Sequence, residues 1–191
     1  MKLPDGVEFQ HLDAGQARDL RSTVEDIYRR SYLEAIASGD PFDSPEQFMH
    51  RFDRYTDPAR GSVFAMVVAH VDCRPAGQIW GWTLSPNAAW WKRFQPDASI
   101  AAFDEFIAED GTRTFGLSEI MVCSEFTGHG LARALHDELL DSRPERRATL
   151  LVEPDNNRAY RAYVKWGWSR VGVTKPSWPN APVFDVLMRD L

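Results

Sequence analysis

The sequence lacks an apolar run long enough for a membrane-spanning helix, and its first residues, MKLPDGVEF, lack the hydrophobic region of a signal peptide. We therefore expect a cytoplasmic protein. Cysteine is scarce: Cys73 and Cys123 are the two thiols, and neither has a metal-ligand neighbour at zinc spacing. We expect free thiols and no metal site. Positive charge is also in deficit, with 22 Lys and Arg against 28 Asp and Glu. A net charge of -6 argues against nucleic-acid binding.

Internal repeats, low-complexity tracts and interdomain linkers are absent too, so 191 residues predict a single domain, 1–191, with a sizeable core. Apolar periodicity predicts strands and helices in a mixed α/β order. A first strand precedes two helices, and a hairpin with a slightly long loop follows them. The expected ranges are a strand at 7–12, a helix after Asp13, a helix from Ser44, and strands at 62–71 and 78–85. Residues 86–113 are the least readable segment, with a short helix expected at 99–111.

The segment from Ser118 to Leu140 predicts a strand, a glycine turn and an amphipathic helix. Gly128 and Gly130 allow a sharp turn whose amides are not covered by side chains. Leu131, Leu135 and Leu139 then recur every four residues and form one apolar helical face. A glycine turn that enters a helix N-terminus is an anion site, most naturally for phosphate.

Other phosphate motifs do not fit this turn. A Rossmann fingerprint needs glycine or alanine three residues after Gly130, where Arg133 stands. A Walker loop needs Gly-Lys-Ser or Gly-Lys-Thr, which the sequence lacks.

Two motifs resemble those of the GNAT acetyltransferase superfamily. The turn is similar to its acyl-CoA motif, Q/R-x-x-G-x-G/A, with Gly130 and Ala132 at the small positions and Thr127 where glutamine or arginine is usual. Downstream, DNNRAYRAYVKWGW is similar to N-x-x-A-x-x-x-Y-x-x-x-G-F, with Trp168 in place of phenylalanine. The resemblance covers the C-terminal half closely, and the N-terminal half agrees in element order.

This resemblance implies a fold and a cosubstrate. The fold is a mixed, mostly antiparallel sheet of about seven strands flanked by helices, with a splayed central strand pair. The cosubstrate is acetyl-CoA, with no metal. The residues that the resemblance assigns to its binding are Met121 and Val122 on the strand, Thr127, Gly128, His129, Gly130, Leu131, Ala132 and Arg133 at the turn, and Asn156 downstream.

The resemblance also implies direct acyl transfer to an amine. Tyr163 is the candidate acid that protonates the departing thiolate, and Tyr160, on nearly the same helical face, stays an alternative. Glu119 is the candidate base, because strand alternation puts it on the opposite face from Ile120 and Val122. His129 is expected to face solvent, and His136 is expected on the polar face of its helix.

The acceptor is predicted to be a small-molecule amine and not a nucleic acid or a membrane. Acidic residues in the expected acceptor regions are compatible with a cationic amine, although a solvated acidic surface is the favoured explanation: Asp40, Asp43, Glu46, Asp104, Glu105 and Glu109. The oligomeric state is open, with a homodimer among the alternatives. One alternative function is a non-catalytic acyl-CoA-binding regulatory module. Another is an interaction protein with Trp90 and Trp91 on its partner surface.

Overall fold

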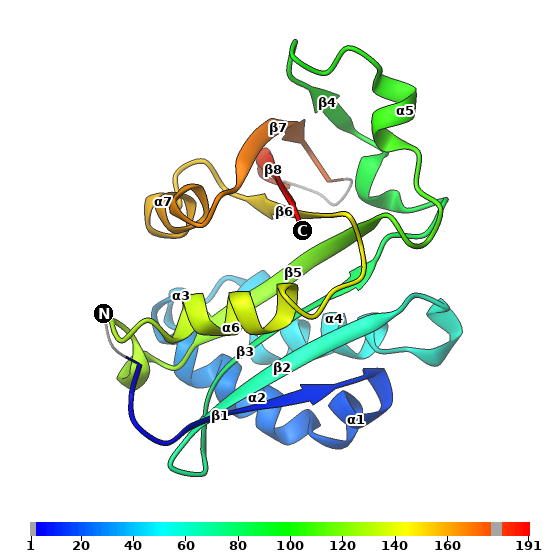
Figure 1. The fold of residues 1–191 in the computed structure, drawn as a ribbon. Helices are drawn as coiled ribbons and strands as arrows, with labels where there is room; N and C mark the ends of the chain where they lie inside the picture. The colour runs from blue at the N-terminus through cyan, green and yellow to red at the C-terminus, as the bar shows by residue number, and fades with distance from the viewer. Residues whose placement is uncertain (1–2, 177–180) are drawn as a thin grey trace. The chain divides into compact units, whose positions relative to one another are not determined.

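A computed structural model describes residues 3–176 and 181–191 (Figure 1). Within these residues no helix combines the length and the apolar character needed to cross a membrane. The α-helices are α1 Ala14–Asp19, α2 Arg21–Ser31, α3 Leu33–Ser38, α4 Pro45–Tyr55, α5 Phe103–Ile107, α6 Leu131–Leu140 and α7 Asn157–Lys165. The strands are β1 Val7–Leu12, β2 Phe64–Val71, β3 Arg74–Thr83, β4 Phe94–Pro96, β5 Thr114–Val122, β6 Arg147–Val152, β7 Ser169–Thr174 and β8 Phe184–Asp190. Short 3-10 turns include η1 Pro41–Asp43, η2 Pro58–Arg60, η3 Ala89–Trp91 and η4 Ser124–Phe126.

The strands pair in the order β1-β2-β3-β5-β6-β8-β7-β4. β5 and β6 run parallel, with Thr114–Leu117 opposite Arg147–Leu150. The pairs β1/β2, β2/β3, β4/β7, β6/β8 and β7/β8 are antiparallel. The predicted mixed, mostly antiparallel α/β fold is therefore confirmed. The described residues contain eight strands rather than about seven, and β4 comes from the segment 86–113 that periodicity could not resolve.

The chain divides into two compact units. Residues 1–82 and 119–142 form the first unit, and residues 83–118 and 143–191 form the second. The prediction of one functional domain over 1–191 stays a prediction.

In the first unit, helices cover two faces of the strands. Phe64, Met66 and Val68 of β2 belong to a core with side chains of α1, α2 and α4. Alternation turns Val67 and Ala69 to the other face, where α6 packs against β2. Successive residues of β2 therefore contact different helices, because their side chains point to opposite faces of the sheet.

Two expected features of the first unit are wrong. The helix expected after Asp13 is three helices, because Leu20 and Tyr32 leave helical geometry, with φ/ψ of -97°/20° and -113°/36°. The β2–β3 loop is a two-residue turn rather than a slightly long loop. Asp72 and Cys73 both adopt left-handed conformations, with φ of 48° and 63°. Such a turn matches the twist of paired strands, so β3 begins at Arg74, four residues earlier than expected.

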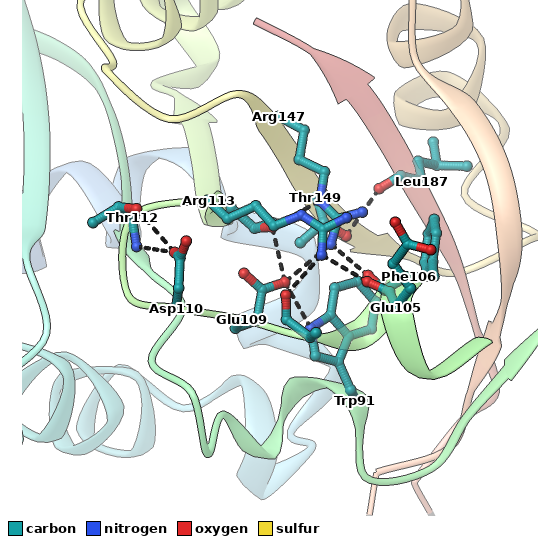
Figure 2. A network of polar contacts seen from close by, with 12 residues as sticks. Trp91, Glu105, Phe106, Glu109, Asp110, Thr112, Arg113, Arg147, Thr149 and Leu187 are labelled. Atoms are coloured by element: carbon teal, nitrogen blue, oxygen red, sulfur yellow. Dashed lines mark hydrogen bonds and ion pairs between the residues drawn. The ribbon is translucent and has the colours of Figure 1, made fainter. Parts of the chain in front are cut away.

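In the second unit, a buried ion pair holds the segment before β5 (Figure 2). The Arg147 guanidinium on β6 donates to Glu109 at 3.1 Å, to the Thr114 hydroxyl at 2.8 Å and to the Phe106 carbonyl at 2.7 Å. Glu109 Oε1 also accepts from the Trp91 indole at 3.0 Å. Glu109 is therefore buried in a structural network, and the hypothesis that it belongs to an acidic acceptor surface is wrong.

Strands β3 and β5 approach each other closely at Gly77, and we expect Gly77→Ala to lower the free energy of unfolding. A Cβ at Gly77 would lie 2.8 Å from the Met121 carbonyl oxygen and 3.0 Å from Leu135 Cδ1. The backbone oxygen cannot move aside easily, so overpacking should cost about 1 to 3 kcal/mol in denaturant unfolding.

Gly15→Ala in α1 is the matched control for this variant. Its Cβ would have only Asp13 Oδ1 within 4 Å, at 3.4 Å, and alanine favours a helix by about 0.5 to 1 kcal/mol. Equal stability of the two variants would contradict the close-approach interpretation.

Candidate active site

The glycine turn has the geometry that its sequence predicts. Gly128 and Gly130 have φ of 84° and 82°, in the left-handed region that favours glycine. Gly130 is the N-cap of α6, and no side chain caps it. The first amides of a helix have no partner inside the helix. The backbone from Gly128 to Ala132 therefore suits an external anion.

The segment before the turn is fixed to α2. Arg30 donates to Glu125 Oε1 at 2.6 and 3.1 Å, and the Ser124 hydroxyl donates to the Arg30 carbonyl at 2.7 Å. A backbone hydrogen bond, together with Arg30, lowers the pKa of Glu125 below its usual value. The Cys123 amide also donates to the Ala76 carbonyl at 2.9 Å. These contacts determine where β5 ends and where the turn begins.

The basic residues near the turn differ in their environments. His129 is exposed, as expected. Arg133 donates to Asp137 one turn later on α6. His136 is fully buried and lies 2.9 Å from Asp137, so its expected position on a polar face is wrong. The packing of α6 on β2 covers a wider stripe of the helix than leucine spacing alone predicts.

Glu119, the predicted base, lies on the α2/α4 side of β5. Because side chains alternate along a strand, Glu119 points to the same face as Met121 and Cys123, which belong to the core of the first unit. By accessible surface its side chain is half-buried, yet enough protein surrounds it that desolvation raises the pKa of Glu119 from 4.5 to about 7. The charge of Arg51 opposes that rise. Among the described residues the Glu119 carboxylate has no hydrogen-bond or ion-pair partner.

Two tyrosines and one arginine accompany this carboxylate. Burial raises the pKa of Tyr28 to about 12, and the charge of Glu119 adds to the rise. Burial and then Glu119 raise the pKa of Tyr55. The charge of Arg51 opposes the rise in the pKa of both phenols. Tyr28, Arg51 and Tyr55 therefore each lie within electrostatic range of Glu119, and the four residues are here called the Glu119 cluster.

Ring stacking gives the Glu119 cluster rigid walls. Tyr28 stacks on Phe48 with centroids 3.8 Å apart and on Tyr32 at 4.9 Å. Tyr55 stacks on Trp82 at 4.4 Å. Sequence reasoning missed Tyr28, Arg51 and Tyr55 as site residues. The sequence holds only a weak indication of them: Arg51 and Tyr55 are four residues apart and therefore share one face of α4.

The downstream motif lies in the second unit. Asn156 is the N-cap of α7, and its Oδ1 accepts from the Ala159 amide at 3.2 Å. Tyr163 is buried, with its ring against Trp166 and Trp168. The environment of Tyr160 differs from that of Tyr163, because burial and the nearby Asp185 carboxylate raise the pKa of Tyr160. The Tyr160 hydroxyl is therefore under the influence of the Asp185 carboxylate, a distinction that helical spacing could not make.

The fold is that of an acetyltransferase domain, as comparisons with known proteins show. The sequence model of the Acetyltransferase (GNAT) family matches residues 22–168. The chain belongs to this family. A comparison with curated proteins found no match.

Solved structures with the same fold are only distantly related in sequence. An acetyltransferase from Thermus thermophilus has a TM-score of 0.64 at 12% identity, with 100% of both chains covered. An aminoglycoside 6'-acetyltransferase type Ii has a TM-score of 0.61 at 15% identity, with 96% of each chain covered. A GNAT family acetyltransferase from Elizabethkingia anophelis with acetyl-CoA bound has a TM-score of 0.57 at 14% identity, covering 98% of this chain and 99% of its own.

We expect Glu119→Gln to stabilise the protein at neutral pH. A carboxyl group whose folded-state pKa is raised holds its proton more tightly when folded, so the parent loses stability as the pH rises from about 4.5 to about 7. Glutamine does not titrate. The melting temperature of the variant should therefore exceed that of the parent by an amount that grows across this range, equivalent to about 1 to 2 kcal/mol after allowance for solvent screening.

Glu125→Gln is the control with the opposite sign. Arg30 and backbone amides stabilise the charged form of Glu125, so its replacement should lower the melting temperature at pH 7. A Glu119→Gln advantage that is the same at pH 4.5 and pH 7.5 would refute the desolvated carboxylate.

Proposed function

We propose that this protein is an acetyl-CoA-dependent N-acetyltransferase that acetylates the primary amine of a small molecule by direct attack in a ternary complex. The observation that carries the proposal is the Glu119 carboxylate, half-buried, with a pKa of about 7 and no partner among the described residues. A base poised near neutral pH is what deprotonation of an ammonium requires. Membership of the acetyltransferase family supports the reaction class.

The proposed donor site is the turn from Thr127 to Arg133. Amides from Gly128 to Ala132 would bind the pyrophosphate of acetyl-CoA, where the helix dipole favours negative charge. This role depends on backbone conformation, and both glycines have the required positive φ. The acetyl-CoA bound to the Elizabethkingia anophelis relative supports the choice of donor. Backbone groups of Met121 and Val122 would contact the pantetheine and the thioester oxygen, and Asn156 would contact the pantetheine arm.

The proposed reaction removes two protons from the acceptor nitrogen and adds one to the departing thiolate. Glu119 accepts one from the acceptor ammonium and releases it to solvent. The free amine attacks the thioester carbonyl carbon, so that a C–N bond forms and the C–S bond breaks. The attacking nitrogen then loses its second proton to solvent, the thiolate takes a proton from Tyr163, and Tyr163 regains its proton from solvent, so that one proton is released overall. The products are the N-acetyl amine and CoA, without a covalent acyl-enzyme.

Thr127 offers a direct test of the donor site. Thr127→Arg restores one of the usual residues of the acyl-CoA motif and adds a positive charge beside the proposed pyrophosphate. It should tighten acetyl-CoA binding about three- to tenfold in titration calorimetry, and Thr127→Glu should weaken it by a similar factor. Both effects should shrink at 0.5 M salt, roughly three times the physiological ionic strength, because salt screens exposed charges.

The controls are Ser22→Arg and Ser22→Glu. Ser22 is exposed and lies on α2 about 12 Å from Arg30 by helical rise. Equal responses at Ser22 and Thr127, or no acetyl-CoA binding by the parent at millimolar ligand, would exclude the proposed site.

Tyr163 and Tyr160 form a matched pair for the proposed acid. Tyr163→Phe should lower kcat about 100-fold or more, the usual contribution of general acid catalysis. Tyr160→Phe should stay within about threefold of the parent, because the Asp185 carboxylate raises the pKa of the Tyr160 hydroxyl and so makes it a poorer proton donor. Thiol release from acetyl-CoA with the best acceptor of an amine panel measures both variants. A fully active Tyr163→Phe would show that the acid is another group.

A further inference from the structure

A cavity of about 350 Å³ opens beside β1, the strand at one edge of the sheet (Figure 1). Its lining residues come from β1, from β2 and from the turn after β2: Glu8, Phe9, Gln10, His70 and Cys73. Glu8 pairs with His70 across the two strands, and residues directly opposite each other in an antiparallel pair lie on the same face of the sheet. The cavity shares no residue with the proposed acetyl-transfer site.

The polar side chains that line this cavity are available to a ligand. Glu8, Gln10, His70 and Cys73 form no side-chain hydrogen bond or ion pair with any residue that the structure describes. A metal ion does not fit, because within the described part of the chain no three His, Cys, Asp or Glu side chains are placed to hold one. Glu8 is the acidic residue of the lining, and its carboxylate favours a cationic group.

Cys73 gives the cavity a nucleophile. Its thiol is free and exposed, whereas Cys123, the second thiol of the chain, is fully buried. Access is one of the factors that decide which thiols exchange with a dissolved disulfide, so Cys73 can react and Cys123 is protected. Phe9 adds a partly buried ring against which methylene groups of an attached molecule can pack.

The turn that carries Cys73 is held in place on both sides. The Asp72 amide donates to the Gly6 carbonyl at 3.3 Å. The Arg74 guanidinium, which follows the turn, lies 3.6 Å from the Glu125 carboxylate. The thiol is therefore fixed beside β1 before any ligand arrives, and a cavity that exists in advance reduces the entropic cost of filling it.

We propose that this cavity is a redox-sensitive modification site, at which Cys73 forms a mixed disulfide with a small disulfide that carries an ammonium group. The Cys73 thiolate attacks one sulfur of the disulfide, so that a new S–S bond forms and the old S–S bond breaks. The Cys73 sulfur is oxidised, and the other half of the reagent is reduced and leaves as a thiolate. The proton that Cys73 loses goes to solvent, from which the departing thiolate takes one up. The attached ammonium would meet Glu8, and its methylene groups would pack on Phe9.

The charge of the lining distinguishes among small disulfides. An anionic reagent such as oxidised glutathione would bring carboxylates toward Glu8, and like charges brought together cost affinity. Arg74, the cation next to Cys73, already has the Glu125 carboxylate within 3.6 Å and so attracts an anion less. This site does not depend on the proposed function, because neither the donor nor the acceptor of an acetyl group takes part in it.

Two disulfides of similar size test the proposal on the full chain. Cystamine carries an ammonium on each half, and 2-hydroxyethyl disulfide carries a hydroxyl in its place. Mass spectrometry of the intact chain gives the rate constant for each reagent. Dividing it by the rate constant with free N-acetylcysteinamide removes the intrinsic difference between the reagents. At low salt the corrected value for cystamine should exceed that for 2-hydroxyethyl disulfide about two- to fivefold, the usual worth of an exposed ion pair. Peptide mapping should place the adduct on Cys73 and not on Cys123.

Variants of exposed residues separate the contribution of the cavity from that of any accessible thiol. Cys73→Ser should abolish the adduct, and Glu8→Gln should remove the preference for cystamine. Asp72→Asn is the matched control, because Asp72 is next to Cys73 but outside the lining; it should keep the larger part of the preference. The proposal is overturned if Cys73 forms no adduct, if the parent shows equal corrected rates, or if the preference survives Glu8→Gln and disappears in Asp72→Asn.

Discussion

The first unit depends on the close approach of β3 to β5 at Gly77. There the position of a side chain is taken by the Met121 carbonyl and by Leu135 of α6. The neighbouring Ala76 carbonyl accepts the Cys123 amide, which ends β5 and directs the chain into η4. Because β5 is held in this register, its two faces contact different helices. Glu119 and Met121 face α2 and α4, whereas Ile120 and Val122 face the side that α6 covers.

Electrostatics then distinguish structural carboxylates from the candidate base. Glu109 and Glu125 each have an arginine within hydrogen-bonding distance. Glu145 likewise contacts Arg143 at 2.8 Å. Glu119 has no such partner among the described residues, although Arg51 is close enough to influence it. A protein that supplies partners for these acids and leaves Glu119 unpartnered retains it at a cost in stability, which is typical of functional groups.

Local signals in the sequence predicted much of the fold and the conformation of the glycine turn. The glycines of the turn, the leucine spacing of α6 and the alternation that places Glu119 are short-range features, and the structure has all three. The breaks at Leu20 and Tyr32 carry no glycine or proline, so periodicity could not locate them. The Asp72–Cys73 turn uses residues that seldom adopt positive φ. Arg51 was missed because its electrostatic effect on Glu119 joins α4 to β5, two elements far apart in the sequence.

Helix α2 contributes to both proposed substrate sites. Tyr28 belongs to the Glu119 cluster, and Arg30, two residues later, holds the segment that precedes the glycine turn. A rigid helix cannot move one of these residues without the other. Selection for a new acceptor through substitutions that shift α2 would therefore also change the affinity for the acyl donor. Evolution of specificity in this protein would be less constrained through α4, which carries Arg51 and Tyr55 and lies outside the segment that leads into the turn.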